Sequence, residues 1–343
     1  MIYRALILIL PALALALPAF AADEVFLPKK NAPPASGTKV KTITIPAAPP
    51  QQTPAAAPAG NDAQLAFGAF QRGNYLEAVQ LAERRAEQNK DPRAMTLLGE
   101  LYGEGLGVPR DLKKSLDWYQ RAANAGDISA TFALGMAHLQ GSGTARNREE
   151  AAKLFRSAAD KGHAAAAYNL ALLYLEGKAF PQNFDEAAKL MRIAAEKDIP
   201  DAQHAMAIFY QEGKGVPKDL QQSVRWLRRA AKLDHVPATI ELAIALFNGS
   251  GVDKDEVSGA LAMRRAALKG NALAQNRLAR MMNAGRGTEK NVIEAMAWHL
   301  MARAQNVSDP ALDDVFGGLK PEDQKKAENI MRAWLQSKAA PNT

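Results

Sequence analysis

The residues of this chain that are able to do chemistry are few, and their spacing matches no catalytic or metal-binding motif. The sequence contains no cysteine, which excludes a thiol nucleophile and thiolate metal ligands. Its five histidines include no His-Glu-x-x-His arrangement, which would place two zinc ligands on one helix face. His163 and His235 occupy the same position of two repeats that are not neighbours, so we expect them to lie beyond metal-sharing distance.

Three short stretches resemble parts of functional loops, but each has the wrong spacing. Gly249-Ser250-Gly251 is not the five-residue turn that exposes a nucleophilic serine. Gly213-Lys214-Gly215 lacks the Ser or Thr that follows lysine in a phosphate-binding loop. Asp253-Lys254-Asp255 begins like a calcium loop, but the required glycine and final glutamate are misplaced. We therefore predict that the protein is not an enzyme and has no catalytic residue, metal site or cofactor.

The elements around these residues form an internal repeat of 36 residues, six copies of which follow one another without an insertion. We number each copy from its first alanine, position 0, which is Ala94 in the first copy. Position 11 is always glycine and position 28 always alanine: Gly105, Gly141, Gly177, Gly213, Gly249, Gly285, Ala122, Ala158, Ala194, Ala230, Ala266 and Ala302. A period of this length is typical of a solenoid.

Each copy has the composition of a helix, a turn and a second helix. Apolar residues at positions 0, 4, 7 and 8 share one helical face. Glycine at position 11 permits the left-handed backbone that ends a helix, and Asp or Asn at position 17 predicts the next N-cap. Four copies have Glu or Gln three residues later, as in a capping box. Small residues in the second helix allow close helix packing.

These repeats resemble the Sel1-like repeat, a relative of the tetratricopeptide repeat. The pattern A-x-x-x-L-G-x-x-Y-x-x-G-x-G-V-x-x-D runs from Ala94 to Asp111 and is followed by Trp118-Tyr119 and Ala122-Ala123. The copy from Ala202 matches almost as well, whereas others lack a consensus glycine, tyrosine or tryptophan. The resemblance implies an all-α fold, a right-handed α/α superhelical solenoid of helix-turn-helix repeats.

The sequence predicts five segments, of which the repeats are the fourth. These are a signal peptide (1–21), a Pro/Ala-rich disordered linker (22–60), a tetratricopeptide-like capping helix pair (61–90), six Sel1-like repeats (91–305), and C-terminal capping helices with a tail (306–343). Solenoids need capping elements because an exposed end repeat would leave its apolar face in water.

Residues 1–21 have the composition of an export signal, with Arg4, an apolar run over 5–17 and the small residues Ala19 and Ala21. We expect cleavage after Ala21, so that the mature protein does not span a membrane. A retained anchor is the alternative, but the run is short and broken by proline. An exported chain without cysteine fits a bacterial periplasm, so we expect a periplasmic or secreted protein. The net charge of +7, without a Lys/Arg block, argues against nucleic acid as a partner.

Two surfaces are candidate binding sites. In tetratricopeptide-like solenoids the first helices line the concave wall, which positions 2, 6 and 9 should face. The middle copies are largely apolar at these positions: Phe132, Met136, Leu139, Tyr168, Leu172, Leu175, His204, Ile208, Gln211, Ile240, Ile244 and Phe247. The end copies are more polar there, as with Glu100, Asn276 and Arg280. The pattern predicts a partner-binding groove, or else apolar residues buried by tight repeat packing.

The second surface is a basic stripe on the second helices, which form the outer wall. Position 26 is arginine in four consecutive copies, two of them with a second arginine beside it: Arg156, Arg192, Arg228, Arg229, Arg264 and Arg265. Such a stripe would bind an anionic polymer or an acidic partner. Ion pairing with neighbouring Asp and Glu on a solvated helix face is the alternative.

The resemblance implies a function in contact rather than catalysis, since Sel1-like proteins generally act as adaptors in signalling and assembly. It favours a non-enzymatic periplasmic scaffold whose concave face binds protein partners, in particular envelope proteins. The alternative is an envelope protein that binds cell wall, peptidoglycan or another anionic glycan through the arginine stripe. Enzyme activity has been proposed for cysteine-rich relatives, but this chain has no cysteine.

Overall fold

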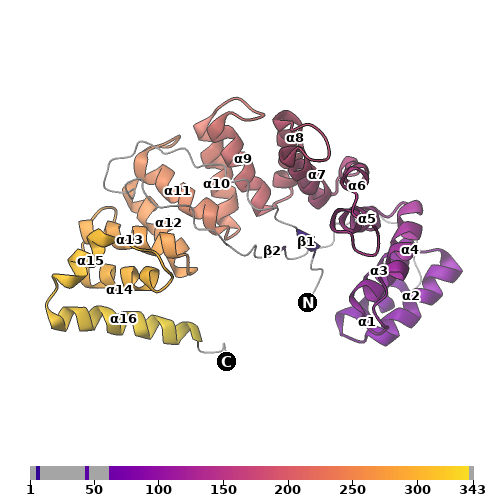
Figure 1. Ribbon diagram of the computed structural model, residues 1–343, viewed down its shortest axis with the longest axis horizontal. Helices are drawn as coiled ribbons and strands as arrows, with labels where there is room; N and C mark the ends of the chain where they lie inside the picture. Colours follow the sequence, from indigo (N-terminus) through magenta and orange to yellow (C-terminus); the bar gives the residue numbers. More distant parts are fainter. Residues whose placement is uncertain (1–4, 8–42, 46–61, 340–343) are drawn as a thin grey trace. The chain divides into compact units, whose positions relative to one another are not determined.

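The computed structural model describes residues 5–7, 43–45 and 62–339, and almost all of this part is helical. Two three-residue strands, β1 (Ala5–Ile7) and β2 (Ile43–Ile45), pair antiparallel with Ala5 opposite Ile45. They lie within the predicted signal peptide and linker, the rest of which falls outside the described residues. The all-α fold of consecutive helix pairs is confirmed (Figure 1).

Helices α1 (Asp62–Gln71) and α2 (Tyr75–Asn89) precede the repeats. Six pairs of helices follow at a constant spacing: α3 (Pro92–Glu104) with α4 (Leu112–Asn124), α5 (Ile128–Gln140) with α6 (Arg148–Asp160), α7 (Ala164–Glu176) with α8 (Phe184–Glu196), α9 (Pro200–Glu212) with α10 (Leu220–Lys232), α11 (Val236–Asn248) with α12 (Glu256–Leu268), and α13 (Ala272–Ala284) with α14 (Val292–Arg303). Helices α15 (Pro310–Gly317) and α16 (Pro321–Ala339) follow the last pair.

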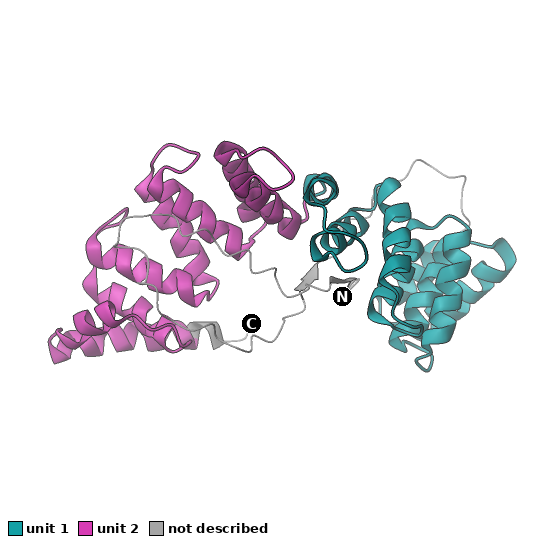
Figure 2. Ribbon diagram, turned by 45° about the horizontal axis from the view of Figure 1, so that its top comes forward, with its two compact units in different colours: residues 1–15, 37–197 teal, residues 16–36, 198–343 magenta. Residues whose placement is uncertain are grey.

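The chain divides into two compact units (Figure 2). Among the described elements, unit 1 contains β1, β2 and α1 to α8, and unit 2 contains α9 to α16. Within each unit the helices pack mainly against their neighbours in sequence. In unit 1, α1 also contacts α3 and α3 contacts α5, as expected of first helices on the inner side of a stack.

The turn between the two helices of a repeat is built from backbone hydrogen bonds that recur in each copy. Glycine at position 11 is left-handed, as at Gly105 with φ 72°. The position-17 side chain then caps the second helix in all six repeats, as predicted; Asn147 Oδ1, for example, accepts from the backbone N–H of Glu150 at 2.9 Å.

The capping-box prediction is wrong in its second half. The backbone N–H of the cap residue does not bond to the glutamate side chain but closes the loop on a first-helix carbonyl, as from Asn147 to the carbonyl of His138 at 2.8 Å. The glutamates are consequently available for other partners, and Glu186 pairs with Lys189 at 2.8 Å.

The contact between the two helices of a repeat depends on a small residue at position 5 of the first helix. Gly135 faces the fully buried ring of Phe155, and a Cβ added to Gly135 would lie only 2.6 Å from it. Gly99 faces the ring of Tyr119 in the same way. In the other four repeats position 5 is alanine and its counterpart at position 25 is neither Phe nor Tyr: Ala171 with Met191, Ala207 with Leu227, Ala243 with Met263, and Ala279 with His299.

Neighbouring repeats approach each other closely at the glycine of position 13. A Cβ on Gly287 would lie 2.1 Å from the carbonyl oxygen of Glu256, at the start of the preceding second helix. A Cβ on Gly251 would likewise lie 2.3 Å from the carbonyl oxygen of Leu220. These glycines therefore set the spacing between consecutive repeats. The third repeat has Ala179 here instead, and this residue is not left-handed.

Candidate protein-binding surfaces

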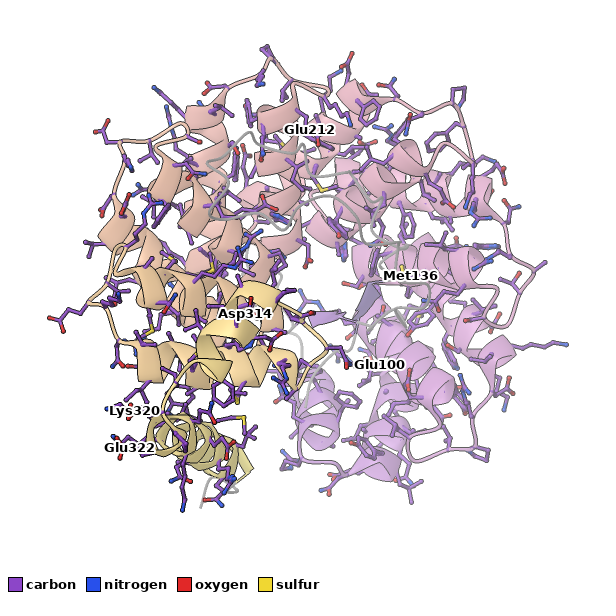
Figure 3. The ribbon with its side chains drawn as sticks, turned by 60° about the vertical axis from the view of Figure 1, so that its left-hand side comes forward. Glu100, Met136, Glu212, Asp314, Lys320 and Glu322 are labelled. Carbon is purple, nitrogen blue, oxygen red and sulfur yellow. The ribbon has the colours of Figure 1, made fainter. Side chains whose placement is uncertain are left out.

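Unit 1 contains six residues of the predicted groove, and four of them are buried. Phe132, Met136, Leu139 and Tyr168 are each at most 9% exposed, whereas Leu172 and Leu175 on α7 are half-buried. Met136 and Glu100, which share position 6 of their repeats, lie on the side of unit 1 that the first helices line (Figure 3). The first helices therefore expose only part of the expected apolar surface.

Two ring contacts hold the buried side chain of Phe132 in place. Its ring stacks on His163 with a centroid distance of 4.6 Å and lies 5.7 Å from the ring of Phe155. His163 is the N-cap of α7, and its Nδ1 accepts a hydrogen bond from the backbone N–H of Ala166 at 3.1 Å. Burial lowers the pKa of His163 to about 4, so the ring is neutral at pH 7.

Unit 2 contains the other six residues of the predicted groove. Ile240 and Phe247 are buried, whereas His204, Ile208, Gln211 and Ile244 are half-buried. The guanidinium of Arg286 covers the ring of Phe247 at 4.5 Å. The aliphatic side chains of this set that a partner is able to reach are Ile208 and Ile244.

A polar cluster crosses the same helices of unit 2, and the repeat pattern does not predict it. His204 Nε2 lies 2.9 Å from Glu241 Oε1, and the His204 and His235 rings are 4.9 Å apart. His235 Nε2 is 3.5 Å from Asp201 Oδ1. These residues occupy different positions of the repeat, so comparing equivalent positions between repeats does not reveal that they lie together. Among the described residues, no group of three or more His, Asp or Glu has a metal-binding arrangement.

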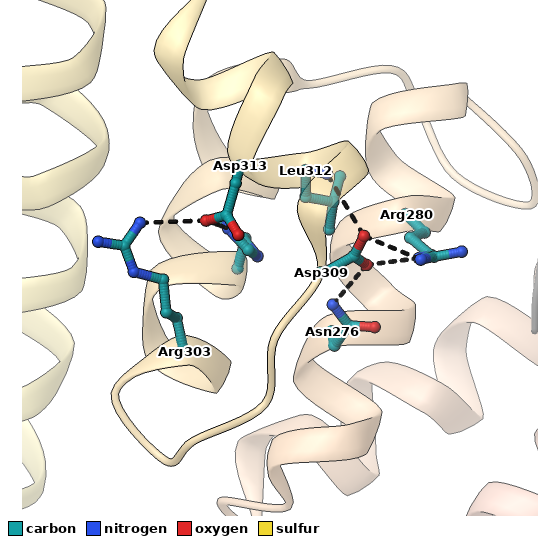
Figure 4. Close-up of polar contacts among 7 residues, drawn as sticks. Asn276, Arg280, Arg303, Asp309, Leu312 and Asp313 are labelled. Atoms are coloured by element: carbon teal, nitrogen blue, oxygen red, sulfur yellow. Dashed lines mark hydrogen bonds and ion pairs between the residues drawn. The ribbon is translucent and has the colours of Figure 1, made fainter. Parts of the chain in front are cut away.

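Arg280 and Asn276 were expected at the polar end of the groove, but they anchor α15 instead (Figure 4). Asp309, only 1% exposed, accepts bonds from Arg280 Nε at 2.6 Å and Arg280 Nη2 at 2.8 Å, and from Asn276 at 2.7 Å. Burial by itself raises the pKa of Asp309, but the hydrogen bonds from Arg280 and Asn276 outweigh it and hold that pKa below its usual value. Asp309 lies beyond the last repeat, so the repeat pattern could not predict this contact.

Most of the arginine stripe is engaged in ion pairs within the chain. Three contacts define the pattern: Arg229 with Asp198 and Arg265 with Asp234, each at 3.1 Å, and Arg264 with Glu294. Arg156 lies 3.7 Å from Glu186 and also donates to the Tyr174 hydroxyl, and Arg192 likewise has an interaction partner.

Arg228 differs from the other stripe residues, because it is exposed and forms no ion pair with any residue that the structure describes. The residue that would correspond to Glu186 or Glu294 in the next repeat is Ser258. A carboxylate at position 20 therefore pairs with the position-26 arginine of the preceding repeat. Because Ser258 stands at position 20 of the fifth repeat, Arg228 is left without an ion pair among the described residues.

Comparison with known proteins places these surfaces on a recognised repeat. The family model described as Sel1 repeat matches residues 92–127, 128–163, 164–199, 200–235, 236–271 and 272–307. A search of curated proteins found no match. None of the helices in the described part of the chain is long and apolar enough to cross a membrane.

Two solved structures illustrate the similarity. The crystal structure of a Sel1 repeat protein from Oxalobacter formigenes is 29% identical, with a TM-score of 0.60, over 73% of this chain and 100% of that one. A protective antigen present in uropathogenic Escherichia coli strains, displaying an SLR fold, is 25% identical, with a TM-score of 0.50, over 81% of this chain and 69% of that one.

Proposed function

Because this chain belongs to the Sel1 repeat family, whose members generally mediate protein interactions, we propose that it is a non-enzymatic scaffold that binds protein partners through its first helices. The observation that carries this proposal is the set of aliphatic side chains left half-buried on those helices. Leu172 and Leu175 in unit 1, with Ile208 and Ile244 in unit 2, are not closed off by the repeat packing around them. Such side chains provide apolar contact area without destabilising the free protein.

We further propose that the scaffold acts in the bacterial envelope, after export and cleavage following Ala21. The support is in the sequence: Arg4, the apolar run over 5–17, the small residues before Asp23, and the absence of cysteine. Envelope proteins are then the partners, and envelope signalling or assembly is the setting.

The anionic-glycan alternative has less support, because most stripe arginines already face a carboxylate of the same chain. Arg229, Arg264 and Arg265 would have to exchange these ion pairs for contacts with the polymer, and Arg228 alone among these four is unpaired. Surface ion pairs contribute little to stability, but they do reduce the positive field that a polyanion would meet.

The proposal is tested by capturing partners from a bacterial envelope extract on the immobilised protein. Leu172→Glu with Leu175→Glu is expected to abolish capture through unit 1, and Ile208→Glu with Ile244→Glu through unit 2, since a buried glutamate opposes apolar contact. Lys153→Glu with Lys189→Glu is the matched control, because these side chains are 75% and 71% exposed and lie on the second helices. Capture that persists in both groove variants, with helical circular dichroism unchanged, would refute binding by the first helices.

A further inference from the structure

The outer face of α12 exposes a stripe of aliphatic side chains. Val257, Leu261 and Leu268 are 60%, 63% and 56% exposed. Their spacing of four and then seven residues places all three on one side of the helix. Exposed aliphatic residues in a row on one helix mark a contact surface more often than scattered ones do.

The first four repeats have no such stripe at the equivalent positions. Val257 and Leu261 occupy positions 19 and 23. The same positions are charged or polar in the first four repeats: Lys113 and Asp117, Glu149 and Lys153, Asp185 and Lys189, and Gln221 and Arg225. They are exposed there as well. The repeat fold therefore does not require apolar residues at these two positions.

The sixth repeat shows what an apolar pair at these positions does. Its residues are Ile293 and Ala297 on α14, and helix α16 lies alongside that helix (Figure 1). Ala297 is 0% exposed, Ile293 is half-buried, and the ring of Trp334 on α16 lies 4.3 Å from that of Trp298. With apolar residues at positions 19 and 23, the second helix of the sixth repeat therefore packs against another helix, whereas in the fifth repeat the same face is exposed.

Unpaired positive charge borders the open face on the side of α10. Arg225, Arg228 and Lys232 are exposed and form no ion pair in the part of the chain that the structure describes. Helix α12 adjoins the end of α10, because Arg265 bonds to the carbonyl of Ala231 and to Asp234. A helix seated on α12 would therefore meet aliphatic side chains along its centre and cations along one edge.

We propose that the α12 face binds an amphipathic helix of a partner protein, with an aliphatic stripe toward Val257, Leu261 and Leu268 and acidic residues toward α10. This surface is separate from the first helices, so it does not depend on the function proposed above. A second copy of this chain fits less well, because apposing two α12 faces would bring their flanking arginines together.

The test uses a fluorescein-labelled synthetic helix of about 18 residues, or five turns, with leucines at 3/4 spacing and glutamates elsewhere. Fluorescence anisotropy with the full chain is expected to show binding that weakens as salt is added. Val257→Asp with Leu261→Lys gives the fifth repeat the pair found in the third, and should weaken binding at least about tenfold. Arg225→Glu with Arg228→Glu should weaken binding and remove most of the salt dependence.

Exchange of the charges in the third repeat, Asp185→Lys with Lys189→Asp, is the matched control and should leave binding unchanged. Because the chain has no cysteine, a solvent-sensitive dye on Leu261→Cys reports contact at this face, and the same dye on Lys189→Cys should not respond. All the substituted residues are exposed, so the variants should keep the fold, which circular dichroism verifies.

Four results would overturn the proposal. The first is equal binding of a peptide with lysines in place of the glutamates, and the second is binding that ignores Val257→Asp with Leu261→Lys. The third is self-association by sedimentation equilibrium that the same variant abolishes, which would identify a second copy as the occupant. The fourth is variant-sensitive binding to vesicles of phosphatidylglycerol and phosphatidylethanolamine without binding to the acidic peptide, which would identify a lipid surface.

Discussion

Gly135 and Phe155 illustrate how closely single side chains are matched in this protein. The ring of Phe155 has no exposed surface and occupies the space that a Cβ at residue 135 would need. Repeats with alanine at this position have a residue other than Phe or Tyr opposite it, as with Ala171 and Met191. The identity of one residue therefore restricts the other.

We predict that Gly135→Ala lowers the free energy of unfolding by about 1–2 kcal/mol, because overpacking outweighs the gain in helix propensity. Adding Phe155→Met creates the pair that the third and fifth repeats already contain. The double variant should be more stable than the sum of the two single effects predicts, by at least about 1 kcal/mol. Urea unfolding of the four proteins measures this coupling, and additive effects would contradict the match.

His163 is a second residue whose chemistry has a measurable consequence. Its pKa is about 4 in the folded protein and 6.5 without the fold, because burial opposes the charged ring. Between these values the unfolded chain binds a proton that the folded chain does not. The contribution of His163 to stability is therefore complete above pH 6.5 and falls as the pH is lowered toward 4.

His163→Asn is expected to reduce this pH dependence while keeping the cap, since Asn271 caps the corresponding helix of the sixth repeat. Free energies of unfolding at pH 7.5 and pH 4.5 provide the measurement. The wild type should lose more stability than the variant, and the difference between the two proteins cancels groups that titrate in both. Equal losses would show that the ring is accessible to protons in the folded state.

At the scale of the element, the turns were more predictable than the surfaces. Asp or Asn at position 17 predicts the N-cap of each second helix, because the short side chain bonds locally whatever its tertiary surroundings. The role of Glu150 and its equivalents was not predictable, because the cap residue's N–H bonds instead to a carbonyl on the previous helix. Competition between a local and a more distant acceptor is not visible in a sequence motif.

Two left-handed glycines in different surroundings provide a test at this scale. We predict that Gly287→Ala costs more than about 2 kcal/mol, because left-handed strain of about 1–2 kcal/mol adds to a clash with the backbone of Glu256. Gly162 is also left-handed, with φ 86°, but a Cβ there would meet no atom within 4 Å. Gly162→Ala should cost only the strain. Thermal unfolding that ranks the two variants equally would contradict a role for close approach between repeats.

At the scale of the whole molecule, the sequence predicted the repeat and its helices but not which first-helix side chains stay accessible. The period follows from glycine, alanine and cap residues whose roles are local. Burial depends on neighbouring repeats: Phe132 is covered in part by His163, the N-cap of helix α7 in the next repeat, whereas Leu172 is left half-buried. Asp309 lies beyond the last repeat, so its contact with Arg280 has no counterpart in the other repeats from which it could be inferred.

Contacts limited mainly to neighbouring helices make stability a local property in this fold. Gly135→Ala is therefore expected to lower hydrogen-exchange protection in α5, α6 and the helices that adjoin them. Protection in α13 and α14 should equal that of the wild type under conditions where the protein stays folded. Hydrogen exchange followed by mass spectrometry provides the comparison, and a uniform loss of protection would show that the chain opens as one cooperative body.

The constant spacing of the helices along the sequence also has a consequence for the evolution of the gene. From Pro92 to Ala272, each first helix begins 36 residues after the previous one, and the second helices keep the same interval. Recombination between the coding sequences of two repeats would therefore remove or add one complete hairpin and keep every cap and turn in register. The gene is thus able to change the length of its product in whole hairpins, while each position-13 glycine, such as Gly287, keeps its place beside the carbonyl that it approaches.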